Sequence, residues 1–289
     1  MTPAAAQAKP LAALFAGAVF IALSPIWVRV SEVGPTASAF WRVMLAAPLL
    51  WIICLANPAG AAPRPNPRLL AAAGIAFAGD LAFWHWSIQY TSVANSTLLA
   101  NLASIFVTLS AWVLWKQRPT GLFLAGLATA LLGTALLVRA SLGISAHALL
   151  GDALGVVTAM FYAGYLLSVK QLRDLGTATL RLMAVTTTIT AALLLPVALA
   201  SGEALLPPTA ASWLKLLGLA WVSHCAGQGL IAYALAHLGA SFSSVGLLLQ
   251  PVLAGAFAWL LLAEPLSATQ IAGGVIVLAG IYVAHRAST

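Results

Sequence analysis

The stretch WLLLAEPLSATQIAGGVIVLAGIYVAHR, residues 259–286, ends in an apolar run of about twenty residues, the length that an α-helix needs to cross the ~30 Å of hydrocarbon in a bilayer. An earlier stretch, residues 112–139, has a similar pattern in WVLWKQRPTGLFLAGLATALLGTALLVR. The matches fall at an offset of 147 positions and pair Trp112 with Trp259, Gly126 with Gly273, Gly133 with Gly280 and Arg139 with Arg286. This self-similarity indicates an internal duplication.

The duplication extends upstream. Ala78-Gly79-Asp80 matches Ala226-Gly227-Gln228, and SAFWRVM around Arg42 resembles TATLRLM around Arg181. Each copy therefore spans five helices, and we expect the copies to occupy residues 1–147 and 148–289. Because five is odd, the second copy must enter the membrane from the opposite side, which gives the inverted topology typical of secondary transporters. The alternative is a chance alignment of the Gly, Ala and Leu that are common in any membrane protein.

Apolar segments long enough to span a membrane fill the rest of the chain. Of 289 residues, 62% are hydrophobic and 7% are charged, against roughly 25% charged in a soluble domain. Lipid must therefore be the main solvent. We predict an all-α integral membrane protein with ten transmembrane helices, near residues 10–30, 36–56, 69–90, 93–116, 120–139, 149–169, 179–200, 213–237, 242–262 and 268–286.

The basic residues predict the orientation of these helices, because loops rich in Lys and Arg stay in the cytoplasm. When the loops are assigned alternately to the two sides, three basic residues fall on one side: Arg29, Arg139 and Lys215. Nine fall on the other: Lys9, Arg64, Arg68, Lys116, Arg118, Lys170, Arg173, Arg181 and Arg286. Both termini are therefore expected in the cytoplasm.

Several classes of function are disfavoured. The basic residues lie in short loops instead of forming one continuous face, so nucleic-acid binding fits poorly. No GxxxxGK[ST] loop is present, which excludes a primary pump built from this chain alone. An intramembrane enzyme would need a nucleophile beside a base, and Ser223-His224 and residues 239–242 are the only suggestive strings. We expect no enzymatic activity, no cofactor and no metal, and a channel remains an alternative.

The last helices carry a family resemblance. AWLLLAEPLSATQIAGGVIVLAGIYV, residues 258–283, resembles the end of EamA-type ten-helix proteins in the drug/metabolite transporter superfamily, and further residues lie in similar places: Gln250-Pro251, Glu264-Pro265, Gln270, Gly273 and Arg42. The resemblance implies a multi-pass exporter of metabolites in the bacterial inner membrane, often of amino acids. Helix 1 lacks the glutamate on which small four-helix multidrug relatives depend, which argues against antiport of lipophilic drugs for protons through that helix.

Polar residues inside hydrocarbon usually face a partner helix or a wet cavity. In the fourth segment the spacing i, i+4, i+7, i+11 places four of them on one narrow arc: Thr97, Asn101, Ser104 and Thr108. We predict that this arc lines a substrate path, with hydrogen bonding between helices as the alternative. In the second half, Tyr162 and Tyr165 share a helix face, and Gln250 precedes a proline that frees the Leu247 carbonyl or simply kinks the helix.

The third segment holds the densest mixture of aromatic and ionisable residues. We predict substrate contacts from His85 and from the aromatic residues Trp84, Trp86 and Tyr90, with packing or lipid contact as the alternative. Helical geometry places Asp80 and His85 on different faces, of which one is expected to meet the cavity and the other a neighbouring helix. Asp80 lies near the middle of the membrane, where it either titrates during transport or pairs with Arg42, His224 or a backbone group.

Neutral amides, hydroxyls and aromatic rings with few fixed charges suit a zwitterion or a neutral amphiphile better than a polyanion. We therefore expect a secondary transporter that exports small metabolites, foremost aromatic or bulky neutral amino acids. Drugs, nucleosides and sugars are the alternatives within the same fold. A single chain of this size can enclose a path alone, so a monomer is sufficient and the oligomeric state is left open.

Overall fold

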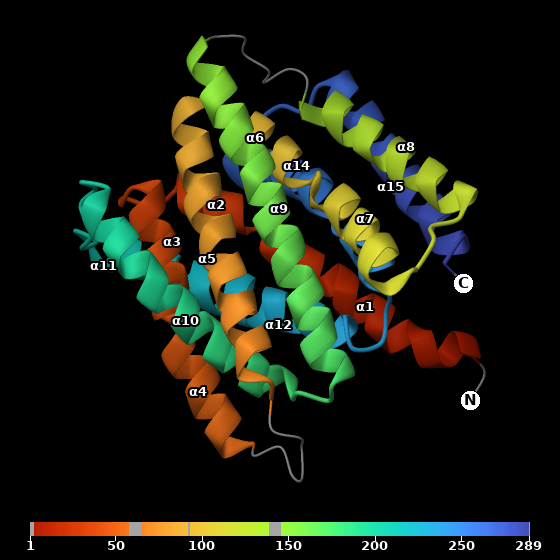
Figure 1. Ribbon diagram of the computed structural model, residues 1–289. Helices are drawn as coiled ribbons and strands as arrows, with labels where there is room; N and C mark the ends of the chain where they lie inside the picture. Colours follow the sequence, from red (N-terminus) through yellow and green to blue (C-terminus); the bar gives the residue numbers. More distant parts are fainter. Residues whose placement is uncertain (1–2, 58–64, 92, 139–145, 289) are drawn as a thin grey trace.

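The computed structural model describes residues 3–57, 65–91, 93–138 and 146–288, and every regular element in these ranges is helical (Figure 1). Eight segments in these ranges are long and apolar enough to cross a membrane, and Gly121–Leu137 is a shorter apolar helix. A further rod, from Ala210 to Ala234, consists of three consecutive helical pieces. Arg64 and Arg139, which the sequence placed in loops, lie outside the described residues.

The helices follow the predicted segments closely. The first half contains α1 (Pro3–Ala22), α2 (Ser24–Arg29), α3 (Pro35–Met44), α4 (Ala46–Ala56), α5 (Pro67–Tyr90), α6 (Val93–Ala100), α7 (Ala103–Trp115) and α8 (Gly121–Val138). The second contains α9 (Ala146–Asp174), α10 (Thr179–Ala200), α11 (Ala210–Leu217), the π-helical η2 (Gly218–Gln228), α12 (Gly229–Ala234), α13 (Ala240–Gly246), α14 (Leu249–Leu262) and α15 (Ala268–Arg286).

Two of the spans are interrupted at corresponding places. A two-residue turn at Asn101–Leu102 separates α6 from α7, and another at Leu247–Leu248 separates α13 from α14. The helices that follow, α7 and α14, both end at a non-glycine residue in the left-handed region, Lys116 at φ 58° and Ala263 at φ 55°. These two residues are 147 positions apart, the same offset that relates the two halves in sequence.

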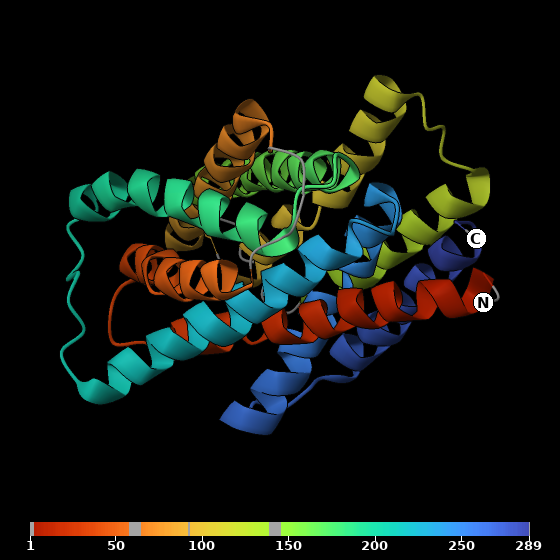
Figure 2. The same cartoon turned by 90° about the horizontal axis from the view of Figure 1, so that it is seen from below.

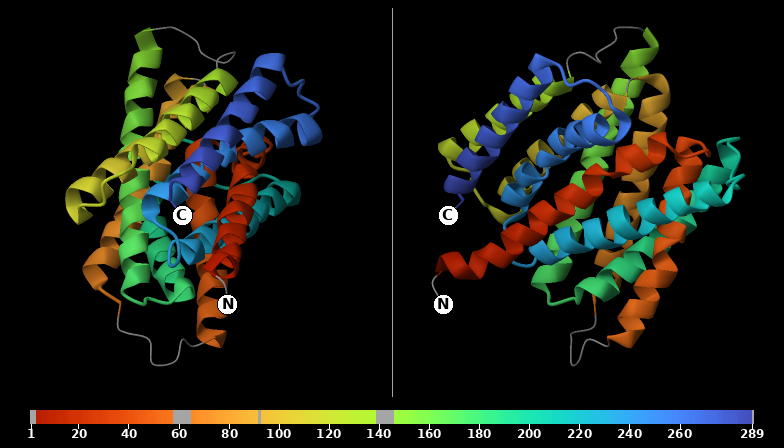
Figure 3. Two further views of the ribbon diagram at one scale, coloured as in Figure 1. Left: turned by 90° about the vertical axis from the view of Figure 1, so that its right-hand side faces the viewer. Right: turned by 180° about the vertical axis from the view of Figure 1, so that it is seen from behind.

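Glycines bring α8 and α15 into direct backbone contact. A Cβ on Gly126 would meet the backbone of Gly280 and Ala284, and a Cβ on Gly133 would meet that of Gly273 and Val277. The order of these contacts makes the helices antiparallel, and they lie side by side in Figures 1 and 3. Since Gly126 corresponds to Gly273 and Gly133 to Gly280, the two contacts exchange under a two-fold rotation. The helix pair therefore has the symmetry expected of inverted repeats.

Other helix pairs show the same reciprocity. In the first half α5 packs along α9 of the second, and α1 packs along η2 and α12, which correspond to α5. Seen from below in Figure 2, α1 runs beside the rod formed by α11, η2 and α12. The N-terminal end of α1 and the C-terminal end of α15 lie at the same end of the bundle (Figures 1 and 2). The two halves are thus interleaved into one membrane domain.

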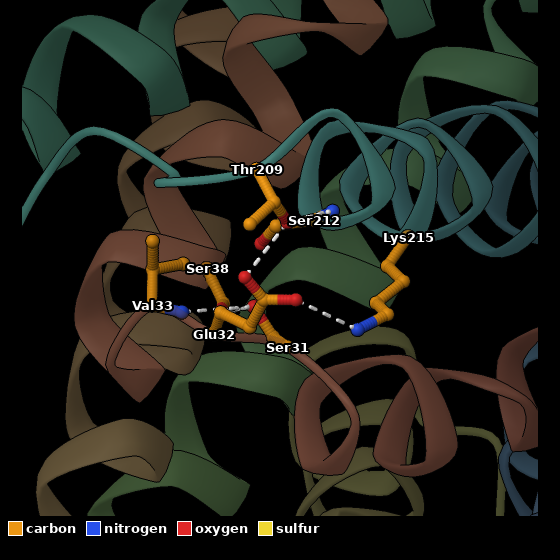
Figure 4. A network of polar contacts seen from close by, with 7 residues as sticks. All are labelled: Ser31, Glu32, Val33, Ser38, Thr209, Ser212 and Lys215. Atoms are coloured by element: carbon orange, nitrogen blue, oxygen red, sulfur yellow. Dashed lines mark hydrogen bonds and ion pairs between the residues drawn. The ribbon is translucent and has the colours of Figure 1, made fainter.

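A polar cluster around Glu32 joins the halves (Figure 4), on the side of the bundle where α3 and α11 lie, opposite the chain termini (Figure 1). The Thr209 hydroxyl donates to Glu32 Oε2 at 2.8 Å, and Lys215 Nζ donates to Oε1 of the same carboxylate at 3.1 Å. Nearby, Glu203 accepts the backbone N–H groups of Thr36 and Ala37, which are otherwise unsatisfied in the first turn of α3. The loop between α2 and α3 is thereby attached to the segment that leads into α11.

This cluster makes stability depend on pH. The Thr209 hydroxyl, and then Lys215, hold the pKa of Glu32 below its ordinary value of 4.5. Because the folded-state pKa is the lower one, the stabilisation is fully present above about pH 5 and is lost as the pH falls through the lowered pKa. We expect Glu32→Gln to lower the unfolding temperature in detergent near neutral pH, and the difference from wild type to vanish in acid. A difference that persists at about pH 3 would contradict this account.

Candidate functional site

A cavity of about 130 Å³ lies between the two halves, with walls from α1, α2, α3, α5, α6, α9, η2 and α14. Its lining combines two charged side chains with amides, hydroxyls and aromatic rings. Five of the buried side-chain atoms that lack a hydrogen-bond partner belong to residues of this lining: Ser24 Oγ, Arg42 Nε, His85 Nε2, Gln228 Oε1 and Gln250 Nε2. Buried polar atoms in native proteins are nearly always hydrogen-bonded, so this concentration makes the cavity the candidate site for a polar ligand.

Arg42 is the cation of the cavity. It projects from the last turn of α3, is only 8% exposed, and holds its guanidinium carbon 5.9 Å from the centre of the Phe77 ring. The ring face attracts the cation and limits the directions in which it can move. The guanidinium forms no ion pair with any described residue. It therefore offers a planar fork of N–H donors, which matches a carboxylate.

Asp80 is the anion of the cavity and lies on α5. Its field acts on Arg42, yet the two side chains form no direct ion pair. All six acidic residues of the chain fall in the described ranges, and Asp80 is the one that lines this cavity. The cavity thus holds one fixed charge of each sign, and the two side chains interact electrostatically without forming a direct ion pair.

His85 presents an acceptor beside these charges. The His85 Nδ1 atom lies 2.5 Å from the Leu81 carbonyl oxygen, and because a carbonyl can only accept, Nδ1 must carry the proton. In the neutral ring this leaves Nε2 as a lone-pair acceptor without a partner. The ring is 2% exposed and packs edge-to-face on Trp84 at 4.8 Å, which fixes its direction. Together with Asp80 it can accept hydrogen bonds from an ammonium or another N–H donor.

Amide groups from the second half complete the lining. The Tyr162 hydroxyl of α9 lies near the side chains of Gln228, at the end of η2, and Gln250, in the first turn of α14, and all three residues line the cavity. Gln228 keeps its Oε1 and Gln250 its Nε2 without a partner. The second half thus contributes one free acceptor and one free donor to the cavity. The π-helical geometry of η2 is rare, and such segments occur frequently at functional sites.

Of the predicted contacts, the structure brings seven to the cavity: Asp80, Trp84, His85, Thr97, Asn101, Tyr162 and Gln250. The prediction that only one of Asp80 and His85 meets the cavity, with the other packed on a neighbouring helix, is wrong, because both line the cavity. Phe77, Asp80, Leu81, Trp84 and His85 all line the cavity, with the spacing i, i+3, i+4, i+7, i+8 of a single broad helix face. Asp80 and His85 form its two edges.

Five predicted contacts lie elsewhere. Trp86 and Tyr90 are 38% and 43% exposed on the outer surface of α5, and Trp86 packs on Phe83. In α7 the Ser104 and Thr108 hydroxyls are buried and donate to the carbonyls of Asn101 and Ser104, one turn back. Tyr165 is buried between Phe77 and the Met183 sulfur.

The freed carbonyl considered at Leu247 is also occupied. It accepts the Gln250 amide at 3.0 Å, because Pro251 falls in the first turn of a new helix, α14, where a missing N–H costs nothing.

Sequence reasoning named Arg42 only as a partner for Asp80, and it missed Gln228 as a contact. The signal for Gln228 was present, since the repeat aligns it with Asp80. Within the described part of the chain, no three His, Cys, Asp or Glu side chains gather closely enough to hold a metal ion.

Comparisons with known proteins agree with this architecture. The model of the EamA-like transporter family matches the chain twice, over residues 9–139 and 149–285. An uncharacterised transporter from Archaeoglobus fulgidus is 30% identical over 270 residues, 89% of this chain and 90% of that protein. The pseudopaline exporter CntI of Pseudomonas aeruginosa is 25% identical over 96% of this chain and 95% of its own.

A crystal structure with 16% sequence identity superposes with a TM-score of 0.83 and covers 96% of this chain and 97% of that one, which shows a shared fold. The double match of the family model follows the duplication seen in the sequence and in the glycine contacts. Together with the apolar helices, it makes this chain a multi-pass membrane transporter and a member of the EamA-like transporter family.

Proposed function

We propose that this transporter exports amino acids, foremost those with aromatic or bulky neutral side chains, across the bacterial inner membrane by alternating access. The observation that carries the proposal is the pair of opposite charges, Arg42 and Asp80, which line one cavity without pairing directly. A zwitterion matches this pair at both ends, with its carboxylate on the Arg42 fork and its ammonium on Asp80. A polyanion would leave Asp80 repelled, and a neutral solute would leave both charges uncompensated.

The remaining lining supports a substrate with an apolar side chain. Phe77, Trp84 and Tyr162 supply rings in the cavity, beside the apolar Ile21, Val28 and Leu81. Such walls favour aromatic or bulky side chains, because burial of apolar surface and ring contacts contribute most of the affinity in small-molecule sites. The polar atoms of His85, Gln228 and Gln250 orient the substrate within these walls.

The charge pattern and the family support the proposed orientation and direction of transport. The excess of basic residues in alternate loops favours cytoplasmic termini, and the chain ends lie at one end of the bundle. The polar cluster around Glu32 then faces the periplasm. Rocking of the inverted repeats about the cavity would expose it to each side in turn. The relative named as an exporter supports outward transport.

A liposome assay tests the substrate. Purified protein is reconstituted into vesicles loaded with a mixture of labelled amino acids, nucleosides and sugars, and efflux of each is followed against protein-free vesicles. We expect aromatic and bulky neutral amino acids to leave first, and Trp84→Ala to raise the concentration for half-maximal efflux about tenfold or more, since buried aromatic contacts dominate binding. Efflux of nucleosides or sugars without any amino acid would refute the proposal.

Trp86 provides the matched control. It is two residues away on the same helix but exposed on the outer surface, so Trp86→Ala removes an equal volume without touching the cavity. We expect this variant to transport like wild type once corrected for the amount of folded protein. Equal losses from both substitutions would assign Trp84 a role in folding instead.

A further inference from the structure

Asp80 differs from every other acidic residue of the chain in its surroundings. Glu32 bonds Thr209 and Lys215, Glu203 accepts amides of α3, Glu264 pairs with Arg29, and Asp174 pairs with Lys170. Asp152, near the start of α9, does not line the central cavity. Asp80 is therefore the single carboxyl group that a solute in this cavity meets.

The ionisable groups around Asp80 cannot substitute for it. From α3 it faces Arg42, and from its own helix His85, whose Nδ1 is bound to the Leu81 carbonyl. From α9 it faces Tyr162 and Tyr165, both neutral phenols. The Cys225 thiol and His224 of η2 do not line the cavity: the thiol donates to the Ala46 carbonyl, and His224 Nε2 lies 2.8 Å from the Thr187 hydroxyl while its ring packs on Phe77. None of these groups forms an ion pair with Asp80.

An empty cavity therefore leaves a carboxylate without a direct counterion at membrane depth. A charge in that position is costly unless it is paired or neutralised. A substrate ammonium supplies the pairing in the loaded state, and a proton supplies neutralisation in the empty state. The two cations compete for one site, and such competition is the physical basis of obligatory exchange.

We propose that this transporter is a proton antiporter in which Asp80 binds the substrate's ammonium group and a proton in alternation; the inference rests on the proposed export of amino acids. On the outer side, the ion pair between Asp80 and the ammonium breaks, the amino acid leaves, and the carboxylate takes up one proton. On the inner side, the carboxylic acid gives that proton to the cytoplasm and binds the next ammonium. One amino acid moves out and one proton moves in per cycle, so one positive charge enters.

The internal repeat supplies a way to relocate the proposed site. Gln228 occupies the position equivalent to Asp80 and lines the same cavity, with its Oε1 unpartnered. A carboxyl group placed there would face the same solute from the other half. The double variant Asp80→Gln, Gln228→Asp therefore moves the carboxyl group across the cavity and preserves the composition of the chain.

The experiment measures the equilibrium distribution of an aromatic amino acid in proteoliposomes, with potassium and valinomycin holding the membrane potential near zero. With the outside more acidic by one pH unit, one-for-one exchange drives the external concentration about tenfold above the internal one, since one unit corresponds to 1.36 kcal/mol. An internal pH dye records the accompanying proton entry. We expect wild type and the control Asp174→Asn, an exposed acid outside the cavity, to reach this ratio.

Asp80→Asn should bring the ratio to about one and abolish substrate-dependent proton entry, while the swapped double variant should restore both at least in part. An equilibrium ratio does not depend on rate, so slower transport by a weakened variant does not disturb the readout. A tenfold ratio in Asp80→Asn would overturn the inference. Wild-type exchange of labelled for unlabelled amino acid without any response to the pH gradient would overturn it while leaving the proposed function intact. If no amino acid exchanges at all, the proposed function fails.

Discussion

Replacing Arg42 with glutamine is expected to raise the amino-acid concentration for half-maximal efflux by at least ~30-fold, because the loss of one partner from a buried charge pair costs about 2–5 kcal/mol. Arg42 is 8% exposed and has no ion-pair partner among the described residues, so its fork is available to a substrate carboxylate. Arg42→Lys keeps the charge but loses the two-pronged geometry, and an intermediate effect is expected. Efflux kinetics in proteoliposomes measure both.

Arg29→Gln is the matched control for this prediction. Arg29 ends α2 and pairs with Glu264 in an exposed position, so its removal deletes an arginine without affecting the cavity. Exposed ion pairs contribute little to stability, and we expect near-normal transport. The assignment of Arg42 to the substrate carboxylate would fail if decarboxylated analogues of the substrate were affected by Arg42→Gln as strongly as the amino acids themselves.

Adding a single methyl group at Gly280 should destabilise the whole protein. The Cβ of Gly280→Ala would collide with the backbone of Ala130 and Gly126, which cannot move aside as a side chain can. Overpacking of this kind typically costs about 1–3 kcal/mol, and the α8–α15 contact is expected to open. Thermal unfolding in detergent, followed by size-exclusion chromatography, measures the effect. Gly133→Ala should behave alike, because the two-fold relation makes its contact with Gly273 and Val277 the counterpart of the contact of Gly280 with Gly126 and Ala130.

The control for this prediction is Gly229→Ala. Gly229 begins α12 within the rod formed by α11, η2 and α12, and a Cβ there would meet no atom within 4 Å. Alanine also favours helix over glycine, by roughly 1 kcal/mol, so this variant should be as stable as wild type or more so. If Gly229→Ala and Gly280→Ala lowered stability equally, helix contact through glycine would not be the explanation.

The sequence predicted the helical segments and their duplication well, because both depend on patterns that repeat along the chain. Lipid selects long apolar runs, and copies of one ancestral unit keep rare residues such as Trp112 and Trp259 in register. The faces of the helices were harder to predict. Trp84 and Trp86 are equally apolar, and only tertiary packing turns the first toward the cavity and the second outward.

The breaks and irregular turns within the membrane-spanning segments also could not be predicted from the pattern of apolar residues. The turn at Asn101 lies in an apolar segment without proline or glycine, and the π-helical η2 contains no residue that forces its geometry. Both depend on contacts between helices, which local preferences do not encode. Of the polar arc predicted in the fourth segment, Thr97 and Asn101 line the cavity, whereas beyond the turn the Ser104 and Thr108 hydroxyls bond to their own backbone and do not reach it.

The glycine contact between α8 and α15 also limits how the molecule can move. Two backbones that touch without intervening side chains have no rotamers to exchange, so this pair acts as a single stiff strut. Bending is then expected where i−3 hydrogen bonds replace the regular i−4 bonds of the helices, at residues 101–102 and 247–248, near the cavity wall. The expected hinges therefore lie beside the cavity, and the rigid α8–α15 pair lies at the edge of the helix bundle.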